Sequence, residues 1–209
     1  MKRHHDIENL LFDLGGVIMN LNRMRAVRAL EALGMDCASS ILGEYAQQGP
    51  FGALESGQIT VDEFHRRMAS YIDAEVSYDD IARAFISFLD GIPPHRLDAL
   101  LSLRKTFGVY LLSNTNALMW STEIDRQFRQ QGLAIDDYFD GVVTSFEARV
   151  MKPDAAIFRY AERKLGIRPD RTVFLDDSQA NCDAAAALGW HTVCVAPGTE
   201  FMDLLTPYL

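Results

Sequence analysis

The sequence predicts an α/β fold, in which a doubly wound parallel sheet carries an inserted all-helical domain. Short apolar runs that suit buried strands recur along the chain, and in the C-terminal half helical patterns separate them. Strands that alternate with helices pair in parallel and have helices on both faces of their sheet. The segment between the first and the second run contains helical patterns only. That segment is therefore predicted to be an insertion.

Five apolar runs mark the predicted strands. The first, residues 10–12, is apolar without alternation and ends at Asp13 and the Gly15-Gly16 pair, as expected for a strand that is buried on both faces. Four runs of similar character follow it, at residues 109–112, 142–144, 172–175 and 192–195.

Helical patterns with recognisable stops connect the last of these strands. Residues 155–165 carry apolar side chains at helical spacing and end at Gly166, with Pro169 just beyond. Residues 180–188 are rich in alanine and end at Gly189. Both segments are predicted to be crossover helices of the parallel sheet.

The segment from residue 21 to residue 91 is predicted to contain helices only. Thr60 and Glu63 form a capping-box pattern at the start of its third helix. The four predicted helices span residues 23–33, 39–45, 61–71 and 78–89, and Gly34, the Gly49-Pro50 pair and Gly57 separate them.

This segment divides the chain into two predicted domains. We assign residues 21–91 to a helical cap, and residues 1–20 and 92–209 to the α/β core. An insertion after the first strand lies over the carboxyl ends of the strands, where open α/β sheets bind ligands. Phe51, Leu54 and Glu55 of the cap either project towards that site or pack between helices, and the sequence leaves both roles open.

Composition restricts the classes of partner. The chain has 209 residues, 48% of them hydrophobic, which is enough to bury one substantial core. No basic patch balances the formal charge of -9, so we expect neither a nucleic-acid nor a membrane partner. The expected oligomeric state is a monomer or a weak homodimer. Cys37, Cys182 and Cys194 are widely spaced, which indicates reduced thiols. With no signal-peptide pattern and no membrane-spanning run, the expected location is cytoplasmic.

Polar clusters that follow four apolar runs are the strongest functional signal. They occupy residues 13–16, 113–116, 152–154 and 176–181. The carboxyl ends of parallel strands meet at one edge of a sheet, so these clusters are predicted to form one site. Their combined chemistry is that of phosphoryl transfer.

Asp13 is the candidate nucleophile. A carboxylate at a strand end can attack phosphorus and form an aspartyl-phosphate if a cation shields the repulsion between the two anions. The Gly15-Gly16 pair lets the backbone approach a phosphate or a metal closely. On its own, Asp13 is more consistent with a solvated strand-end or turn aspartate, and the Gly15-Gly16 pair shifts that balance.

Ser113, Asn114 and Lys152 are candidates for binding the phosphoryl group. The hydroxyl and the amide are suitable donors to a phosphoryl oxygen, and the lysine can neutralise both nucleophile and substrate. Pro153 keeps Lys152 out of a helix interior. The alternatives are ordinary turn chemistry for Ser113 and Asn114, and a solvated side chain for Lys152.

The adjacent carboxylates Asp176 and Asp177 are the most specific local signal. They would repel each other at a strand end without a cation, and an oxygen-rich site of this kind suits Mg²⁺. Asn181, four residues after Asp177, can reach back to the site from the first helical turn. The alternative is a helix N-cap role for Asp177 or Ser178.

At these residues the sequence resembles the haloacid dehalogenase superfamily, in its subgroup of sugar-phosphate phosphatases with a helical cap. The resemblance covers essentially the whole chain and implies a Rossmann-like core. It implies a catalytic role for Asp13 and Lys152, phosphoryl binding by Ser113, Asn114 and Lys152, and a Mg²⁺ site formed by Asp13, the Gly15 carbonyl, Asp176 and Asp177.

The sequence departs from this family at Gly15. Most phosphatases of the family carry an aspartate there, which protonates the leaving group and then activates water. Such acid–base help contributes about 10² to 10⁴ in rate. A cap residue, a metal-ordered water or a good leaving group are three possible substitutes, and the sequence does not distinguish them.

Three functions are compatible with these residues. The leading hypothesis is a Mg²⁺-dependent phosphatase that hydrolyses a small phosphorylated metabolite, a sugar phosphate, through an aspartyl-phosphate. Dehalogenation of a 2-haloacid by Asp13 would need no general acid, but it would leave Asp176 and Asp177 without a cation. A catalytically silent protein that binds a ligand or partner is supported by Gly15 alone.

Overall fold

The central sheet has the predicted architecture. The computed structural model of the chain describes residues 6–43, 47–72 and 75–208, and within these ranges five strands form one sheet in the order β3-β2-β1-β4-β5. All neighbouring strands pair in parallel, which confirms the doubly wound α/β fold. The strands are β1 (Asn9–Phe12), β2 (Gly108–Ser113), β3 (Gly141–Thr144), β4 (Thr172–Asp176) and β5 (His191–Cys194).

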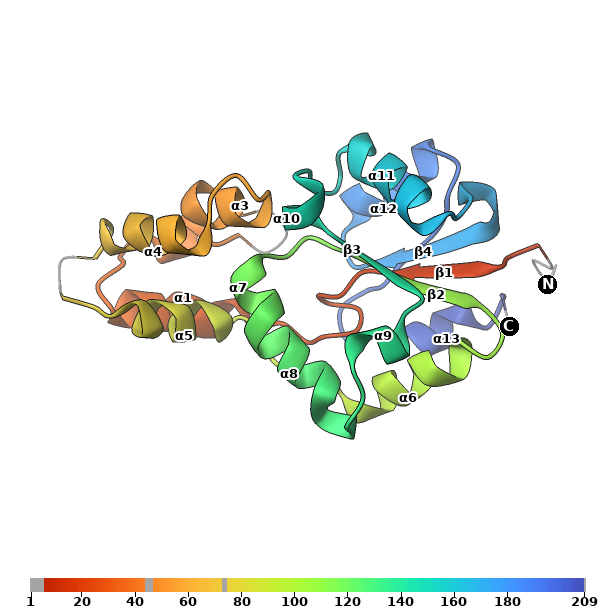
Figure 1. The fold of residues 1–209 in the computed structure, drawn as a ribbon, viewed down its shortest axis with the longest axis horizontal. Coiled ribbons are helices and arrows are strands. Elements are labelled where there is room, and N and C mark those ends of the chain that lie inside the picture. Colours follow the sequence, from red (N-terminus) through yellow and green to blue (C-terminus); the bar gives the residue numbers. More distant parts are fainter. Residues whose placement is uncertain (1–5, 44–46, 73–74, 209) are drawn as a thin grey trace.

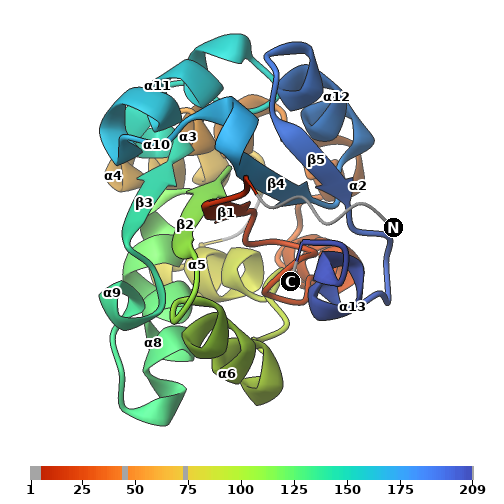
Figure 2. The same cartoon turned by 90° about the vertical axis from the view of Figure 1, so that its right-hand side faces the viewer.

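Helices cover both faces of this sheet (Figures 1 and 2). Side chains alternate along a strand, so Leu11 packs in one buried cluster while Leu10 and Phe12 pack in the other. The helices that contribute to the Leu11 cluster are α11 (Ala155–Leu165) and α12 (Gln179–Ala187), and those on the opposite face are α6 (Pro94–Leu103) and α13 (Phe201–Leu205).

The remaining helical segments of the core are short. They are α7 (Ala117–Met119), a π-helical turn (Trp120–Ile124), α8 (Asp125–Phe128), a 3-10 turn (Arg129–Gln131), α9 (Ile135–Tyr138), α10 (Ser145–Ala148) and a second 3-10 turn (Pro169–Arg171). No helix in the described ranges is long and apolar enough to cross a membrane.

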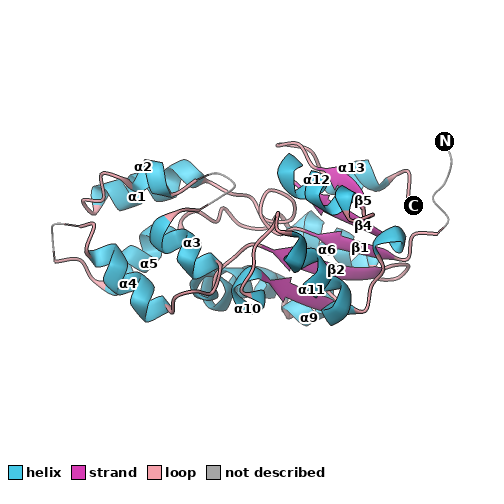
Figure 3. Ribbon diagram, turned by 90° about the horizontal axis from the view of Figure 1, so that it is seen from above, coloured by secondary structure: helices cyan, strands magenta, loops and turns pink. Residues whose placement is uncertain are grey.

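The chain between β1 and α6 is helical, as predicted, and its helices group at one end of the molecule (Figures 1 and 3). Its centre contains the rings of Phe51, Phe64 and Phe85, whose centroids lie 4.7 to 5.6 Å apart. The helices are α1 (Arg23–Ala32), α2 (Ala38–Ile41), α3 (Gly49–Glu55), α4 (Val61–Ala69) and α5 (Tyr78–Ile86).

One of these helices was not predicted. Gly49 and Pro50 were expected to separate helices, but they form the first turn of α3. Proline suits that turn because its missing N–H would have no partner in the helix. Helix α2 is shorter than predicted, and residues 44 and 45 of that prediction lie outside the described ranges.

Two antiparallel segments connect these helices to the sheet. Leu21 and Leu89 form an isolated antiparallel bridge. The Asn20 N–H donates to the Gly91 carbonyl at 2.9 Å, and the Asp90 N–H donates to the Asn20 carbonyl at 2.8 Å. The chain therefore leaves and re-enters the sheet layer at adjacent points, which supports our proposal that the cap spans residues 21–91.

Arg96 fixes the loop after β1 to α6 and to the start of α13. Its side chain is only 8% exposed, and its guanidinium donates two hydrogen bonds of 2.9 Å to the Glu200 carboxylate. It also donates to the Ile18 carbonyl at 3.2 Å and to Asn20 Oδ1 at 3.0 Å. The hydrogen bonds from Arg96, with a smaller contribution from His95, lower the pKa of Glu200 to about 2.

This ion pair predicts a pH-dependent stability. Because the pKa of Glu200 falls from 4.5 to about 2 on folding, its contribution is present above pH 4.5 and is lost as the pH falls towards 2. We expect Glu200→Gln to lower the free energy of unfolding by roughly 1 kcal/mol at pH 6, a modest value because the carboxylate is partly exposed. Urea denaturation of both proteins from pH 6 to pH 2 measures the difference. A difference that stays constant over this range would contradict the prediction.

Candidate active site

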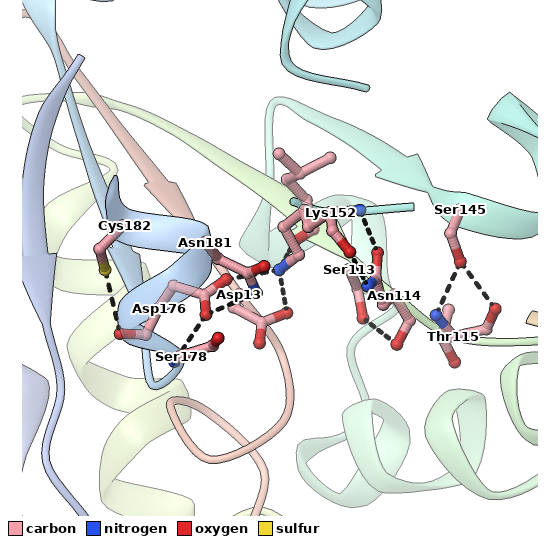
Figure 4. Close-up of polar contacts among 11 residues, drawn as sticks. Asp13, Ser113, Asn114, Thr115, Ser145, Lys152, Asp176, Ser178, Asn181 and Cys182 are labelled. Atoms are coloured by element: carbon pink, nitrogen blue, oxygen red, sulfur yellow. Dashed lines mark hydrogen bonds and ion pairs between the residues drawn. The ribbon is translucent and has the colours of Figure 1, made fainter. Parts of the chain in front are cut away.

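The predicted polar clusters meet at one edge of the sheet (Figure 4). Residue Phe12 of β1 pairs with Leu111 of β2 and with Leu175 of β4. This register places Asp13, which follows Phe12, beside the ends of both neighbouring strands. The polar residues that end or follow the three strands are Asp13, Ser113, Asn114, Asp176 and Asp177.

Lys152 lies between two of the carboxylates. Its Nζ is 2.8 Å from Asp13 Oδ1 and 2.7 Å from Asp176 Oδ2, and it donates to the Leu112 carbonyl at 2.9 Å. The side chain is only 1% exposed. Burial lowers the pKa of Lys152, but the carboxylates of Asp13 and Asp176 outweigh burial and raise it overall. The lysine is therefore a charged component of the site and not a solvated surface residue.

Asn114 holds the Lys152 backbone in place. Its Nδ2 donates to the Lys152 carbonyl and its Oδ1 accepts from the Lys152 N–H, both at 2.9 Å. This two-bond pairing attaches the chain that carries Lys152 to the end of β2. Ser113 is buried beside it and makes one long contact, 3.5 Å from its hydroxyl to the Asn114 carbonyl.

Three carboxylates form a compact oxygen cluster. Asp13, Asp176 and Asp177 each offer an oxygen within 4.8 Å of the others. Asp176 Oδ1 also accepts from the Ser178 N–H and from Asn181 Nδ2, each at 2.9 Å, so Asn181 reaches the site as predicted. Such a set of oxygens suits a hard divalent cation such as Mg²⁺.

The charge balance of this cluster favours a cation. Burial raises the pKa of Asp13 to about 7, and the charges of Asp176 and Asp177 add to the shift while Lys152 opposes it. Among the described side chains at this cluster, Lys152 is the one cation against three carboxylates. A divalent ion would bring these charges close to balance.

Gly15 and Gly16, which follow Asp13, differ in the reason why a larger side chain does not fit at each position. At Gly16, φ is +71°, and a Cβ would lie 2.1 Å from Asp177 Oδ2, so only glycine fits. At Gly15, a Cβ would lie 2.9 Å from Leu21 Cδ1. A carboxylate at residue 15 would therefore require Leu21 to move.

A cavity of about 750 Å³, open solvent at its mouth included, extends from this cluster to the cap. Its base is lined by Asp13, Gly15, Ser113, Asn114, Lys152 and Asp177, whereas Asp176 is fully buried and does not line the cavity. Its wall combines polar Gln47 and Glu55 with apolar side chains, namely Leu21, Leu42, Phe85, Phe88, Leu89, Met119 and Ile124.

The structure separates the three cap candidates. Phe51 and Leu54 are buried and pack within the apolar core, whereas Glu55 lines the cavity. The sequence did not single out Gln47 or the apolar wall. Leu21 and Leu89 could have been noticed, because they stand at the two predicted boundaries of the cap.

Residues 7–189 match the sequence family of haloacid dehalogenase-like hydrolases. The chain belongs to this family, as the resemblance predicted. It is 33% identical to D-ribitol-5-phosphate phosphatase of Bacteroides thetaiotaomicron, in an alignment that covers 97% of this chain and 98% of the relative.

Solved structures of similar fold include two close relatives. A haloacid dehalogenase family enzyme of Bacteroides thetaiotaomicron, crystallised with magnesium and inorganic phosphate, has a TM-score of 0.89 and 36% identity over 95% of this chain and 98% of that one. A predicted hydrolase of the same family from Porphyromonas gingivalis has a TM-score of 0.89 and 34% identity over 96% and 97% of the two chains.

Lys152→Ala is expected to destabilise the protein in the presence of a chelator. The substitution leaves the buried carboxylates of Asp13 and Asp176 without their cation, and breaking a buried ion pair from one side typically costs about 3 kcal/mol or more. Urea denaturation of both proteins in excess chelator measures the loss. The exposed variant Lys164→Ala removes a partly exposed pair with Glu147 and serves as the control. Equal effects of the two substitutions would contradict the prediction.

Proposed function

We propose that this hydrolase is a Mg²⁺-dependent phosphomonoesterase that acts on a small phosphorylated metabolite through an aspartyl-phosphate. The observation that carries the proposal is the position of Asp13. Its carboxylate lies at the base of the cavity, is held by Lys152 and belongs to the cluster of three carboxylates.

The residues divide into two groups in this proposal. Asp13, the Gly15 carbonyl, Asp176 and Asp177 would hold Mg²⁺, with Asp176 sharing its oxygens with the neighbouring donors. A bound Mg²⁺ would shield the Asp13 carboxylate from the anionic substrate and stabilise charge on the phosphoryl oxygens.

Asp13 and Lys152 carry the first step. One oxygen of Asp13 is bonded to Lys152 Nζ, which fixes the carboxylate at the end of β1. The other oxygen attacks phosphorus, and Lys152 with Ser113 and Asn114 supplies positive charge and polar donors around the phosphoryl group. Fixed donors of this kind need no rearrangement during the reaction.

The relatives and the cavity support a proposal for the substrate class. The D-ribitol-5-phosphate phosphatase relative spans nearly the whole chain, which supports a sugar or sugar-alcohol phosphate as the substrate. Gln47 and Glu55 are polar residues of the cap that line this cavity and can contact hydroxyl groups. They support a substrate whose leaving group carries hydroxyl groups.

The dehalogenase alternative is disfavoured by the carboxylate cluster. A nucleophilic carboxylate that attacks carbon needs no metal, and two further carboxylates near Asp13 would then only raise its pKa and hinder its ionisation. The same carboxylates are useful when a cation is bound. This charge balance is our reason for preferring phosphoryl transfer.

Activity is expected to require Mg²⁺. Hydrolysis of 4-nitrophenyl phosphate should disappear in excess chelator and return when Mg²⁺ is added, because the cluster of Asp13, Asp176 and Asp177 otherwise repels the anionic substrate. The measurement is the steady-state rate of nitrophenolate release. Full activity in excess chelator would contradict the metal-dependent mechanism.

Asp13→Asn should abolish turnover and preserve the fold. The amide has nearly the shape of the carboxylate but is not nucleophilic, so the rate should fall at least about 10³-fold. The assay is hydrolysis of 4-nitrophenyl phosphate with Mg²⁺, and circular dichroism checks the fold. A variant that keeps more than a few per cent of the wild-type rate would place the nucleophile elsewhere.

A further inference from the structure

A phosphate ester of an alcohol needs a proton donor when its P–O bond breaks. An alkoxide is a poor leaving group, so protonation of its oxygen accelerates the step. Gly15 supplies no side chain, and Leu21 occupies the space next to it. A side chain from another part of the cavity would supply this proton if it reaches the leaving oxygen.

Glu55 stands on the cap side of this cavity, at the C-terminal end of α3. The end of α3 is fastened to the core. The buried Ser145 hydroxyl donates to the Glu55 carbonyl at 2.7 Å, and it also bonds the Thr115 backbone beyond β2. This hydrogen bond connects the backbone of Glu55 to the loop that carries the phosphoryl-binding candidates.

Gly57 allows the turn after α3 to pack closely against α10 of the core. Its φ is +64°, and a Cβ there would lie 2.2 Å from the Phe146 carbonyl oxygen of α10. The turn after α3 therefore contacts the core backbone directly. Glu55, two residues earlier, is held beside the cavity by two contacts. One is the hydrogen bond from Ser145 to its carbonyl, and the other is the packing of Gly57 against Phe146.

The Glu55 side chain is free to act on a ligand. It makes no hydrogen bond or ion pair with any residue in the described ranges, and its surroundings within the cavity are partly apolar. The charged groups that share the cavity are Asp13, Lys152 and Asp177. Burial, with the charge of Asp13 added, raises the pKa of Glu55 to about 8, so the carboxyl group is available in its protonated form near neutral pH.

We propose that Glu55 is the general acid and base of this enzyme and replaces the carboxylate that residue 15 lacks. The proposal rests on the phosphatase function proposed above. Neither Phe51 nor Leu54 of the same helix can take this role, because both are buried and apolar.

The proposed reaction has two balanced steps. In the first, Asp13 attacks phosphorus, the bond from phosphorus to the alcohol oxygen breaks, and Glu55 gives its proton to that oxygen. The products are the free alcohol, the aspartyl-phosphate and the Glu55 carboxylate. In the second, Glu55 takes a proton from water, the water oxygen attacks phosphorus, and the bond to Asp13 breaks. Inorganic phosphate leaves, and both side chains return to their starting forms.

This division of steps makes a specific kinetic prediction for Glu55→Gln. With an alkyl phosphate such as a sugar-alcohol phosphate, kcat should fall at least about 100-fold, because the leaving alkoxide is not protonated. With 4-nitrophenyl phosphate, the stable nitrophenolate needs no proton. Stopped-flow mixing should then show a burst of one nitrophenolate per enzyme, followed by slow turnover while water attack is unassisted.

Glu31→Gln is the matched control. Glu31 is exposed on α1 of the cap and does not line the cavity, so this variant should behave like the wild type with both substrates. Circular dichroism and the melting temperature check that both variants keep the fold.

Three outcomes overturn the role of Glu55 without overturning the phosphatase function. One is a Glu55→Gln enzyme within threefold of wild type on alkyl phosphates, and another is an equal loss with both substrates and no burst. The third is a wild type that hydrolyses aryl but not alkyl phosphates, which would leave the proposed phosphatase function intact. A wild type with Mg²⁺ that hydrolyses neither ester would instead overturn the phosphatase function and, with it, the role of Glu55.

Discussion

The contact of Lys152 with Asp13 and Asp176 is the interaction on which the rest of the site depends. It joins residues that follow or end two different strands, and the lysine itself comes from a third part of the chain. A buried ammonium is costly unless paired, and two carboxylates and the Leu112 carbonyl supply the pairing. The parallel register of β1, β2 and β4 is what brings these partners together.

Much of the core could be predicted because its signals are local. Each strand is a short apolar run, and the two predicted crossover helices, α11 and α12, end at or next to a glycine, so topology follows from order along the chain. The polar residues of the base of the site were predicted for a similar reason. They follow strands directly, and parallel strands bring their carboxyl ends to one edge. Lys152 was also predicted, but its burial between Asp13 and Asp176 was not, because it depends on three segments that are distant in the sequence.

The cap was predicted less completely, and the reasons are tertiary. Gly49 and Pro50 act as helix breakers in most local contexts, but here they begin α3. The apolar wall of the cavity has no distinctive pattern, since Leu21, Phe85 and Met119 read as ordinary core residues. Glu55 was one of three candidates on one helix. Only its three-dimensional position separates it from Phe51 and Leu54.

The arrangement of the site separates two tasks between the two parts of the chain. In our proposal, the core positions the nucleophile and binds the phosphoryl group, which every phosphate ester has. The cap would contribute Glu55 and part of the cavity wall, and these would contact the leaving group. Proton donation and recognition of the leaving group would thus depend on the same contact, that of the turn at Gly57 with α10. A leaving group that displaces the turn at Gly57 from α10 would also displace Glu55. Such a substrate would be bound without its leaving oxygen being protonated. Selectivity would then be expressed in the rate of the first chemical step as well as in binding.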